Sequence, residues 1–408
     1  MPQSKPAQAQ ICRRGLCIAP MLDTIAPPMR HRTGNQTMMQ DDEITRVLKE
    51  TLENFAAAEL WPSAEAIDHS GQVPAEHWQK IAELGVTAPV IGEEFLTPGQ
   101  YLLVAEELGR GDPAVALGAL GRAQLAVLAA AAEPVSLPES LRATLADANK
   151  TTAVLLYEGF GRAPENYSAT ATPTDTGWTI DGLKYTVGGP ARPDLAAVIA
   201  RDTGDANLKA FIVEPQNASG FEVERDGAQV ATCGLGGAAP VSRVRLNGVP
   251  AIAVLELNED ALLRTVSLLR LSPAAVAVGT TAKGIEYAAE YANERVSHGK
   301  PIAAHQGVSF MLVDARLSLD ALRLAFEDVA AAIADDSASG AAVSELTTRI
   351  CRDAYQAALQ GTRDCVQVLG GHGFIKDHPV ERLYRAALGI AALDCDTRRL
   401  LAVSSRIS

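Results

Sequence analysis

The strongest constraint on the fold is a regular spacing of apolar residues in the last third of the chain. Between His305 and Asp335, apolar residues recur at alternating intervals of four and three, a repeat typical of helices that pack lengthwise against other helices. They are Val308, Leu312, Ala315, Leu319, Leu322, Phe326, Val329 and Ile333. The segment 343–369 behaves in the same way and ends at Gly370-Gly371, so the C-terminal part is predicted to be a bundle of long helices.

Composition agrees with a helical protein and narrows the classes of partner. Apolar residues make up 47% of the 408-residue chain and aromatic residues only 5%, so the interior must be filled mainly by Ala, Val, Leu and Ile. The formal net charge is −13 and no basic stripe alternates with aromatic residues, which argues against a nucleic-acid partner. No membrane span is expected, because Gly, Pro or charge interrupts each run before about 20 apolar residues.

The six cysteines are too few and too scattered for a disulfide framework or a zinc site. We therefore expect no metal site and a reducing, cytoplasmic location. Cys365 and Cys395 have apolar neighbours in the sequence and are expected to be packed thiols rather than nucleophiles.

The first 38 residues differ from the rest of the chain. They carry five basic residues against one acid, several prolines and little periodicity. A targeting segment is one interpretation, but the apolar stretch Cys17–Leu22 is short and broken by Pro20. Residues 1–38 are therefore predicted to be a disordered tail or an upstream extension, and a helix with Asp41 or Asp42 as its N-cap is expected to follow.

The spacing of apolar residues in the remaining chain changes twice, from helical to strand-like and back to helical. This predicts three domains. Residues 39–150 show helical spacing, including a helix that Pro74 opens and Gly85 stops. Residues 151–256 hold short β-branched runs, with strands expected at 195–200, 210–213, 221–225 and 241–246 and a hairpin turn at Asp181-Gly182. Helical spacing returns after Asn258, so residues 257–408 form the bundle domain. The predicted fold class is α+β, mainly α.

Four sequence blocks, in this order and at these intervals, resemble the acyl-CoA dehydrogenase family from about Asp41 to the C-terminus. They are VAEELGR at 104–110, RVSHGKPI at 295–302, HQGVSFML at 305–312, and VQVLGGHGF at 366–374 followed by VERLYR at 380–385. The resemblance implies an N-terminal helical domain, a middle β barrel and a C-terminal four-helix bundle, usually assembled as a tetramer. It also implies FAD as cofactor, an acyl-CoA thioester as substrate and an electron-transfer flavoprotein as electron acceptor.

The resemblance assigns one group of residues to the FAD of a neighbouring subunit. Arg295, Gln367 and Gly371 match the positions that reach its pyrophosphate and adenosine, and this suits their chemistry. A guanidinium pairs with phosphate oxygens, and a glycine lets backbone N–H groups approach closely. Ser297, His298 and His305 align with further contacts, although His298 replaces the usual phenylalanine. A helix end at Gly370-Gly371 and ordinary histidines are the alternative interpretation.

The segments that would hold this chain's own flavin depart from the family pattern. The strand end that binds the flavin in the family aligns with residues 157–164, where Tyr157, Arg162 and Ala163 replace a threonine, a glycine and a serine. The element that covers one flavin face aligns with Thr186-Val187-Gly188. Each change removes a hydrogen-bond donor, a close backbone approach or a stacking plane.

The catalytic base is also altered. Alignment places Asp394 where the family has its glutamate, so the carboxylate is one methylene shorter, and Leu269 occupies the alternative base position. A misplacement of about 1 Å can cost about 100-fold in rate. Arg270 matches an arginine that contacts the CoA moiety, or is an ordinary solvated arginine. Glu381 and Arg382 are expected only to pair or cap at a helix start.

Three hypotheses follow. The favoured one is a subunit of a heteromeric acyl-CoA dehydrogenase that lacks the usual glutamate and donates FAD contacts to a homologous partner, as in enzymes of steroid side-chain degradation. The second is a self-sufficient homotetramer with Asp394 as base. The third is a CoA-thioester binding protein without a redox role. Fatty acids and steroid side chains are both possible acyl groups at this stage.

Overall fold

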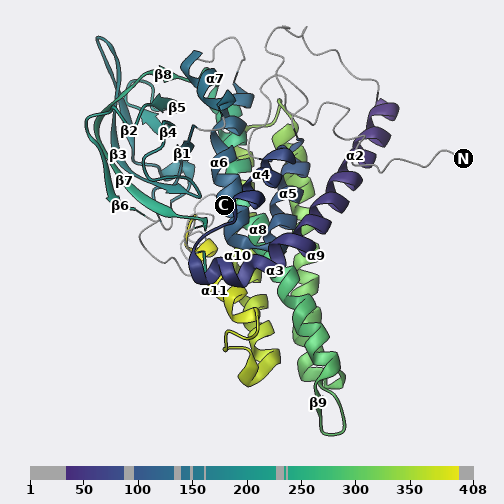
Figure 1. Ribbon diagram of the computed structural model, residues 1–408. Helices are drawn as coiled ribbons and strands as arrows, with labels where there is room; N and C mark the ends of the chain where they lie inside the picture. The colour runs from purple at the N-terminus through teal and green to yellow at the C-terminus, as the bar shows by residue number, and fades with distance from the viewer. Residues whose placement is uncertain are drawn as a thin grey trace, which may run out of the picture.

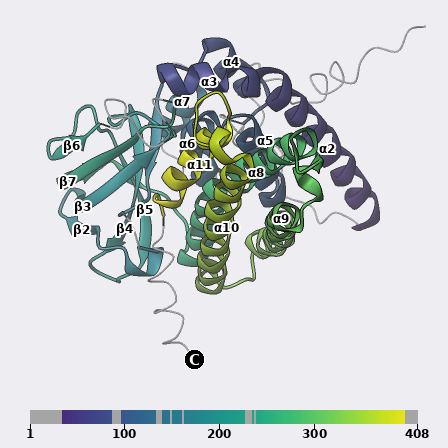
Figure 2. The same ribbon diagram turned by 90° about the horizontal axis from the view of Figure 1, so that it is seen from below.

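The computed structural model describes residues 34–86, 96–132, 139–147, 150–159, 162–226, 234–235 and 238–394, with side chains from residue 43 onward. The described chain is a helical body with a sheet on one flank (Figure 1). Seen from below, the sheet lies on one side of the molecule and α9 on the other (Figure 2).

The N-terminal helices are α2 (Gly34–Phe55), a π-helical segment (Ala56–Leu60), α3 (Trp61–Ser70), α4 (Ala75–Glu83), α5 (Pro98–Gly111), α6 (Pro113–Ala131) and α7 (Glu139–Ala146). Two starts are fixed by local chemistry. Thr97 forms a reciprocal capping box with Gln100 at the start of α5, and the Asp112 carboxylate accepts two backbone N–H bonds at the start of α6.

The predicted helix between Pro74 and Gly85 is confirmed, since α4 starts after Pro74 and Gly85 adopts a left-handed φ of 76°. The expected N-cap at Asp41 or Asp42 is wrong, because α2 already begins at Gly34. The predicted end of the tail at residue 38 therefore falls within this helix, and residues 1–33 lie outside the described part of the chain.

The middle of the chain forms an eight-stranded sheet. Its strands are β1 (Thr152–Leu155), β2 (Thr170–Thr174), β3 (Gly177–Val187), β4 (Leu195–Asp202), β5 (Leu208–Val213), β6 (Phe221–Arg225), β7 (Val241–Ala251) and β8 (Ala253–Val254). The order is β6-β7-β3-β2-β4-β5-β8, and β1 pairs in parallel with β4. Because β7 pairs with β3 and β8, directly after it, pairs with β5, one continuous stretch joins both sides and rolls the sheet towards a barrel.

The four predicted strands are present, but the hairpin at Asp181-Gly182 is wrong. Strand β3 continues through both residues, and the turn that precedes it lies between Thr174 and Gly177. Gly182 marks a register shift in the pairing with β7, where an added Cβ would lie 2.7 Å from the Cβ of Ala169. Gly182 therefore lies at an irregularity within a long strand, and the chain does not reverse direction there.

The C-terminal bundle consists of α8 (Glu259–Glu294), α9 (Gln306–Ala334), α10 (Gly340–Leu369) and α11 (Val380–Ala391). Both long helices expected from the four-and-three spacing are confirmed, and Asn258 caps α8. Helix α8 is buried over most of its length. It contacts α5 so closely that a Cβ on Gly279 would lie 1.9 Å from the carbonyl oxygen of Glu106.

Two helices exceed the length and apolarity that the sequence analysis allowed. Pro113–Ala131 and Glu259–Glu294 are each long and apolar enough to cross a membrane, which corrects the expectation that no stretch would qualify. In the fold, however, 83% and 94% of their most apolar windows are buried, as expected for central helices of a packed core.

The outer face of α9 carries a row of exposed apolar side chains. Phe310, Val313, Leu317 and Leu324 are between 51% and 63% exposed, and their spacing places them along one side of the helix. Rows of this kind are typical of interaction surfaces.

The buried carboxyl of Glu107 on α5 predicts a pH dependence of stability. Burial raises its pKa to about 7, against the partly compensating charge of Arg110. Because the folded state holds this proton more tightly than the unfolded state, the contribution of Glu107 to stability falls as pH rises from about 4.5 to about 7. Arg110 keeps Glu286 as a second partner at 2.7 Å.

Glu107→Gln is therefore expected to raise the free energy of unfolding at pH 8 by about 1–3 kcal/mol and to change it little at pH 4.5. Denaturant titrations at both pH values measure this difference, with Glu65→Gln at an exposed position of α3 as control. An equal effect at both pH values would contradict the assignment.

Candidate functional site

A buried ion pair joins α8 to the residues that follow α11. The side chains of Arg270 and Asp394 are both 0% exposed. Nε of Arg270 donates to both carboxylate oxygens at 3.1 Å, and Nη2 lies 3.0 Å from Oδ2. Nη1 donates to the hydroxyl of Thr348 on α10 at 2.9 Å. The structure therefore brings the predicted base and the predicted CoA contact together and joins them to each other.

This pairing restricts what Asp394 can do. Burial raises the pKa of its carboxyl, and the charge of Arg270 opposes that rise. Both carboxylate oxygens face the guanidinium, whereas a general base must have an oxygen directed at the proton that it removes. Leu269, at the alternative base position, is fully buried and apolar. In this protomer the carboxylate of Asp394 is therefore paired with the guanidinium of Arg270.

Two buried tyrosines lie close enough for the ion pair to act on their hydroxyls. Tyr157 is 2% and Tyr167 4% exposed, and neither hydroxyl has a hydrogen-bond partner among the described residues. Burial raises the pKa of Tyr157, and the charge of Asp394 raises it further. Burial also raises the pKa of Tyr167, against the charge of Arg270. Both phenols are therefore neutral at physiological pH.

The strand-end segment at 157–164 is occupied by a second buried ion pair. Glu158 accepts hydrogen bonds from the backbone N–H groups of Ser168 and Ala169 at 2.6 and 2.8 Å. Its carboxylate lies 3.0 Å from Nζ of Lys184, which is fully buried and whose pKa burial lowers to about 8. Arg162 lies 3.6 Å from the same carboxylate. The segment's charged groups are thus used within the protomer.

The segment Thr186-Val187-Gly188 is packed against α6. Gly188 has a left-handed φ of 74°, and an added Cβ would lie 2.2 Å from the carbonyl oxygen of Leu117. Thr186 is fully buried. Neither residue presents an aromatic plane, and the Thr186 hydroxyl, which has no partner among the described residues, is buried. Together with the two ion pairs, this arrangement does not fit an isoalloxazine ring held by this chain alone.

The residues assigned to a neighbour's FAD lie at the opposite end of the bundle, where α8 and α10 end and α9 begins. This is the lower end in Figure 1, away from the sheet. Arg295 follows the last residue of α8 and is exposed, and its guanidinium has no ion-pair or hydrogen-bond partner among the described residues. Gln367 and Gly371 are also exposed, and an added Cβ on Gly371 would meet nothing within 4 Å.

The short hairpin at this end explains the position of His298. Strands β9 (Val296–Ser297) and β10 (Lys300–Pro301) are antiparallel, with His298 and Gly299 as the two turn residues. Both have positive φ, 51° and 79°, which a two-residue hairpin turn of the primed type requires. The turn leaves His298 exposed, while His305 packs edge-on against it and places Nε2 3.3 Å from the carbonyl oxygen of Ser297.

These six residues therefore share one end of the bundle, where Arg295, His298, Gln367 and Gly371 are exposed and Ser297 and His305 are half-buried. The exposed guanidinium suits a phosphate, and the open glycine allows close backbone approach. They fit the role of donating contacts to a nucleotide held mainly elsewhere. The sequence analysis overlooked Tyr287, Tyr291 and His378 at the same end. The available signal was the spacing of the two tyrosines, which places them on one helix face.

The sequence analysis also made predictions for two cysteines, for Glu381 and Arg382, and for metal ligands. Cys365 is a buried thiol as expected, whereas Cys395 lies outside the described residues. Glu381 pairs with Arg385 at 2.8 Å, and Arg382 lies 3.5 Å from the carboxylate of Asp112. No cluster of three or more possible metal ligands occurs within the described ranges.

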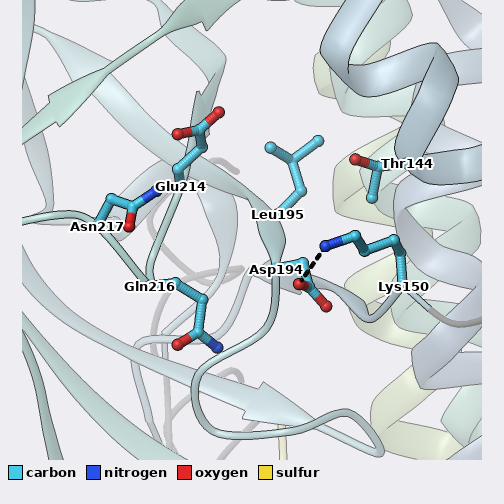
Figure 3. A pocket seen from close by; sticks show the side chains of 7 residues that line it. All are labelled: Thr144, Lys150, Asp194, Leu195, Glu214, Gln216 and Asn217. Atoms are coloured by element: carbon cyan, nitrogen blue, oxygen red, sulfur yellow. Dashed lines mark hydrogen bonds and ion pairs between the residues drawn. The ribbon is translucent and has the colours of Figure 1, made fainter.

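Two surface hollows lie on the sheet side, away from the ion pair. One of about 270 Å³ is lined by Thr144, Lys150, Asp194, Leu195, Glu214, Gln216 and Asn217. A dashed line in Figure 3 joins Lys150 to Asp194, whose charged atoms lie 3.0 Å apart, and the side chains of Glu214, Gln216 and Asn217 lie across from them. The other, of about 570 Å³, lies beside Arg192 and Glu224. Neither is lined by a residue of the candidate site.

The helical N-terminal part, the rolled sheet and the helical bundle follow one another in the order that the resemblance implies for a flavin-dependent dehydrogenase. Family models confirm this class. The acyl-CoA dehydrogenase N-terminal domain matches residues 42–133, and the acyl-CoA dehydrogenase C-terminal domain matches residues 260–394. The chain belongs to the acyl-CoA dehydrogenase family.

Relatives of known name agree with this assignment. An acyl-CoA dehydrogenase of Bacillus subtilis is 27% identical over 375 residues, which cover 88% of this chain and 93% of the relative. The short-chain specific acyl-CoA dehydrogenase of Megasphaera elsdenii is 26% identical over 358 residues, covering 82% and 90%.

Solved structures show the same fold. Butyryl-CoA dehydrogenase from Megasphaera elsdenii superimposes with a TM-score of 0.71 at 21% identity, covering 93% of this chain and 99% of that one. A variant of the steroid ACAD Tcur3481-Tcur3483 gives a TM-score of 0.71 at 22% identity, covering 90% and 98%.

The buried pair predicts a strongly non-additive response to mutation. Arg270→Met and Asp394→Leu, made singly, are each expected to lower the free energy of unfolding by about 3–5 kcal/mol, because each leaves a buried charge without its partner. The double variant is expected to lose much less than the sum, since it buries two apolar side chains instead.

Denaturant unfolding of the four proteins measures the coupling. The exposed pair Arg316 and Asp320 on α9 gives a matched control, for which the same substitutions should change stability by less than about 1 kcal/mol. Additive losses at Arg270 and Asp394 would show that the two side chains do not form the pair described.

Proposed function

We propose that this chain is the subunit lacking the usual catalytic glutamate in a heteromeric, FAD-linked acyl-CoA dehydrogenase. The assembly would remove hydrogens from the α and β carbons of an acyl-CoA thioester, with an electron-transfer flavoprotein as acceptor. FAD supplies the electron-accepting ring when bound, and the homologous partner subunit supplies the base. This chain contributes the exposed residues at the end of its bundle, and the assembly is cytoplasmic.

The observation that carries the proposal is the contrast between the two halves of the site. The charged groups near the predicted flavin and base positions are paired within this protomer, above all Asp394 with Arg270. The groups that face outwards remain free for a ligand, as Arg295 shows among the described residues. A chain that acted alone would need the first set to be available.

Two further observations support a partner subunit. The exposed apolar row on α9, formed by Phe310, Val313, Leu317 and Leu324, offers a surface for assembly. In addition, the similar steroid ACAD has a name that joins two designations, Tcur3481 and Tcur3483. A steroid side chain is accordingly the acyl group that we would test first.

Arg295 is expected to contribute to FAD retention in the assembly. A hydrogen bond to a charged group contributes about 1.5–3 kcal/mol, so Arg295→Ala should weaken FAD binding by roughly 10- to 100-fold. The measurement is the flavin-to-protein ratio after co-expression with a homologous subunit that carries the glutamate. Arg245→Ala, at an exposed arginine of β7, is the control that should leave the ratio unchanged.

The same preparations separate the three hypotheses. A mixed assembly that binds flavin and turns over acyl-CoA, while this chain alone is colourless, supports the proposal. Stoichiometric flavin and turnover with this chain alone, abolished by Asp394→Asn, would establish the homotetramer instead. Binding of CoA thioester without flavin in every assembly would establish the non-redox binding protein.

A further inference from the structure

Helix α2 lies at the edge of the helical body and packs against one face of α5 (Figure 2). By helical spacing, Gln100, Glu107 and Gly111 share a face of α5. Gln100 donates to the hydroxyl of Thr45 on α2 at 3.0 Å, and an added Cβ on Gly111 would lie 2.7 Å from Cβ of Leu60 in the π-helical segment. Glu107 lies between these two contacts, so α2 and the π-helical segment cover it.

The carboxyl of Glu107 is buried at this interface without full compensation. Its side chain is 5% exposed, and Oε2 accepts no hydrogen bond from any described residue. Nε of Arg110 lies 3.3 Å from Oε2, but Nη2 of the same guanidinium lies 2.7 Å from Glu286 of α8. One cation is therefore shared between two carboxylates.

The other charges around Glu107 do not remove this deficit. On α5 itself Glu106 adds a like charge, which pairs with Arg323 of α9 at 2.6 Å. On α2, Glu53 opposes the ionisation of Glu107 and Lys49 favours it, and these two side chains lie 3.8 Å from each other. Burial above all, and then the two neighbouring carboxylates, raise the pKa of Glu107 to about 7.

Helix α2 has the features of an arm that is lightly held. Among its described side chains only Leu52 and Phe55 are buried, and both lie in its last turn. The segment directly after it, Ala56–Leu60, is π-helical, and helices bend at such turns. Ala56 and Leu60 are buried, so the pivot is anchored, whereas the helix before it has few buried contacts to oppose local opening.

We propose that α2 is a pH-sensitive arm, which docks on α5 while Glu107 is protonated and lifts about the π-helical turn when Glu107 loses its proton. Lifting returns the pKa of Glu107 towards its ordinary value of 4.5, because water then reaches the carboxylate. The docked state is therefore favoured most at and below pH 4.5 and loses this advantage as pH rises to about 7. The opening equilibrium constant rises by up to about tenfold per pH unit in this window and levels off above it.

Hydrogen exchange of the α2 amides in the full-length protein tests this inference. After correction for the intrinsic pH dependence of exchange, their protection is expected to fall about tenfold or more between pH 5 and pH 7 and to change little between pH 7 and pH 8. In Glu107→Gln the protection should stay constant over the whole range. In Glu53→Gln the fall should be smaller, because one like charge is removed. Glu65→Gln, at an exposed position of α3, is the matched control and should behave as the wild type.

Urea separates lifting of the arm from unfolding of the whole chain. Lifting exposes little surface, so exchange of α2 should respond weakly to about 0.5 M urea, whereas exchange of α10 through global unfolding should respond strongly. The same pH dependence of α2 protection in the wild type and in Glu107→Gln would overturn the inference. Exchange of α2 only in the urea-sensitive step that also exposes α10 would overturn it too. Both results would leave the proposed function standing, since it rests on other residues.

Discussion

The ion pair between Arg270 and Asp394 is the interaction on which the organisation of this chain depends. Placing two opposite charges in a dry interior is costly, so the pair persists only where geometry and hydrogen bonds compensate. Here the guanidinium engages both oxygens of the carboxylate and a threonine hydroxyl on a third helix. The pair thereby ties α8, α10 and the segment after α11 together at the position where the sequence analysis predicts the catalytic base.

On the sheet side, Glu158 and Lys184 form a second buried ion pair. Glu158 is satisfied by backbone donors and by Lys184, and the end of β3 packs directly against α6. A buried polar network of this kind is rigid, because releasing one member exposes its partner without compensation. The sheet side is therefore closed apart from the buried, unpaired hydroxyls of Tyr157 and Tyr167, while the exposed, unpaired guanidinium of Arg295 lies at the far end of the bundle.

The sequence predicted the helices of the bundle well, because a four-and-three repeat depends only on residue spacing. Gly85 and Asn258 also marked helix ends correctly, since their preferences are local. The hairpin predicted at Gly182 was wrong, because a glycine occurs at strand irregularities as well as at turns. Only the tertiary contact with Ala169 shows which of the two is present.

The sequence predicted single residues of the candidate site, because motif positions are local, but it did not predict which of these residues meet. Motif positions identified Arg270 and Asp394 individually, but 124 residues separate them, and no spacing rule reveals that they meet. His372 and His378 likewise meet Tyr291 and Tyr287 only because two turns fold back onto α8. Pairing across long separations is a property of tertiary packing.

The length of α8 has a consequence for stoichiometry. At 1.5 Å per residue, Arg270 and Arg295 lie about 37 Å apart along the helix axis, farther than one dinucleotide extends. The two arginines of one protomer therefore cannot touch the same cofactor. A cofactor held at the exposed end of this bundle and any cofactor beside Arg270 would therefore be two separate molecules.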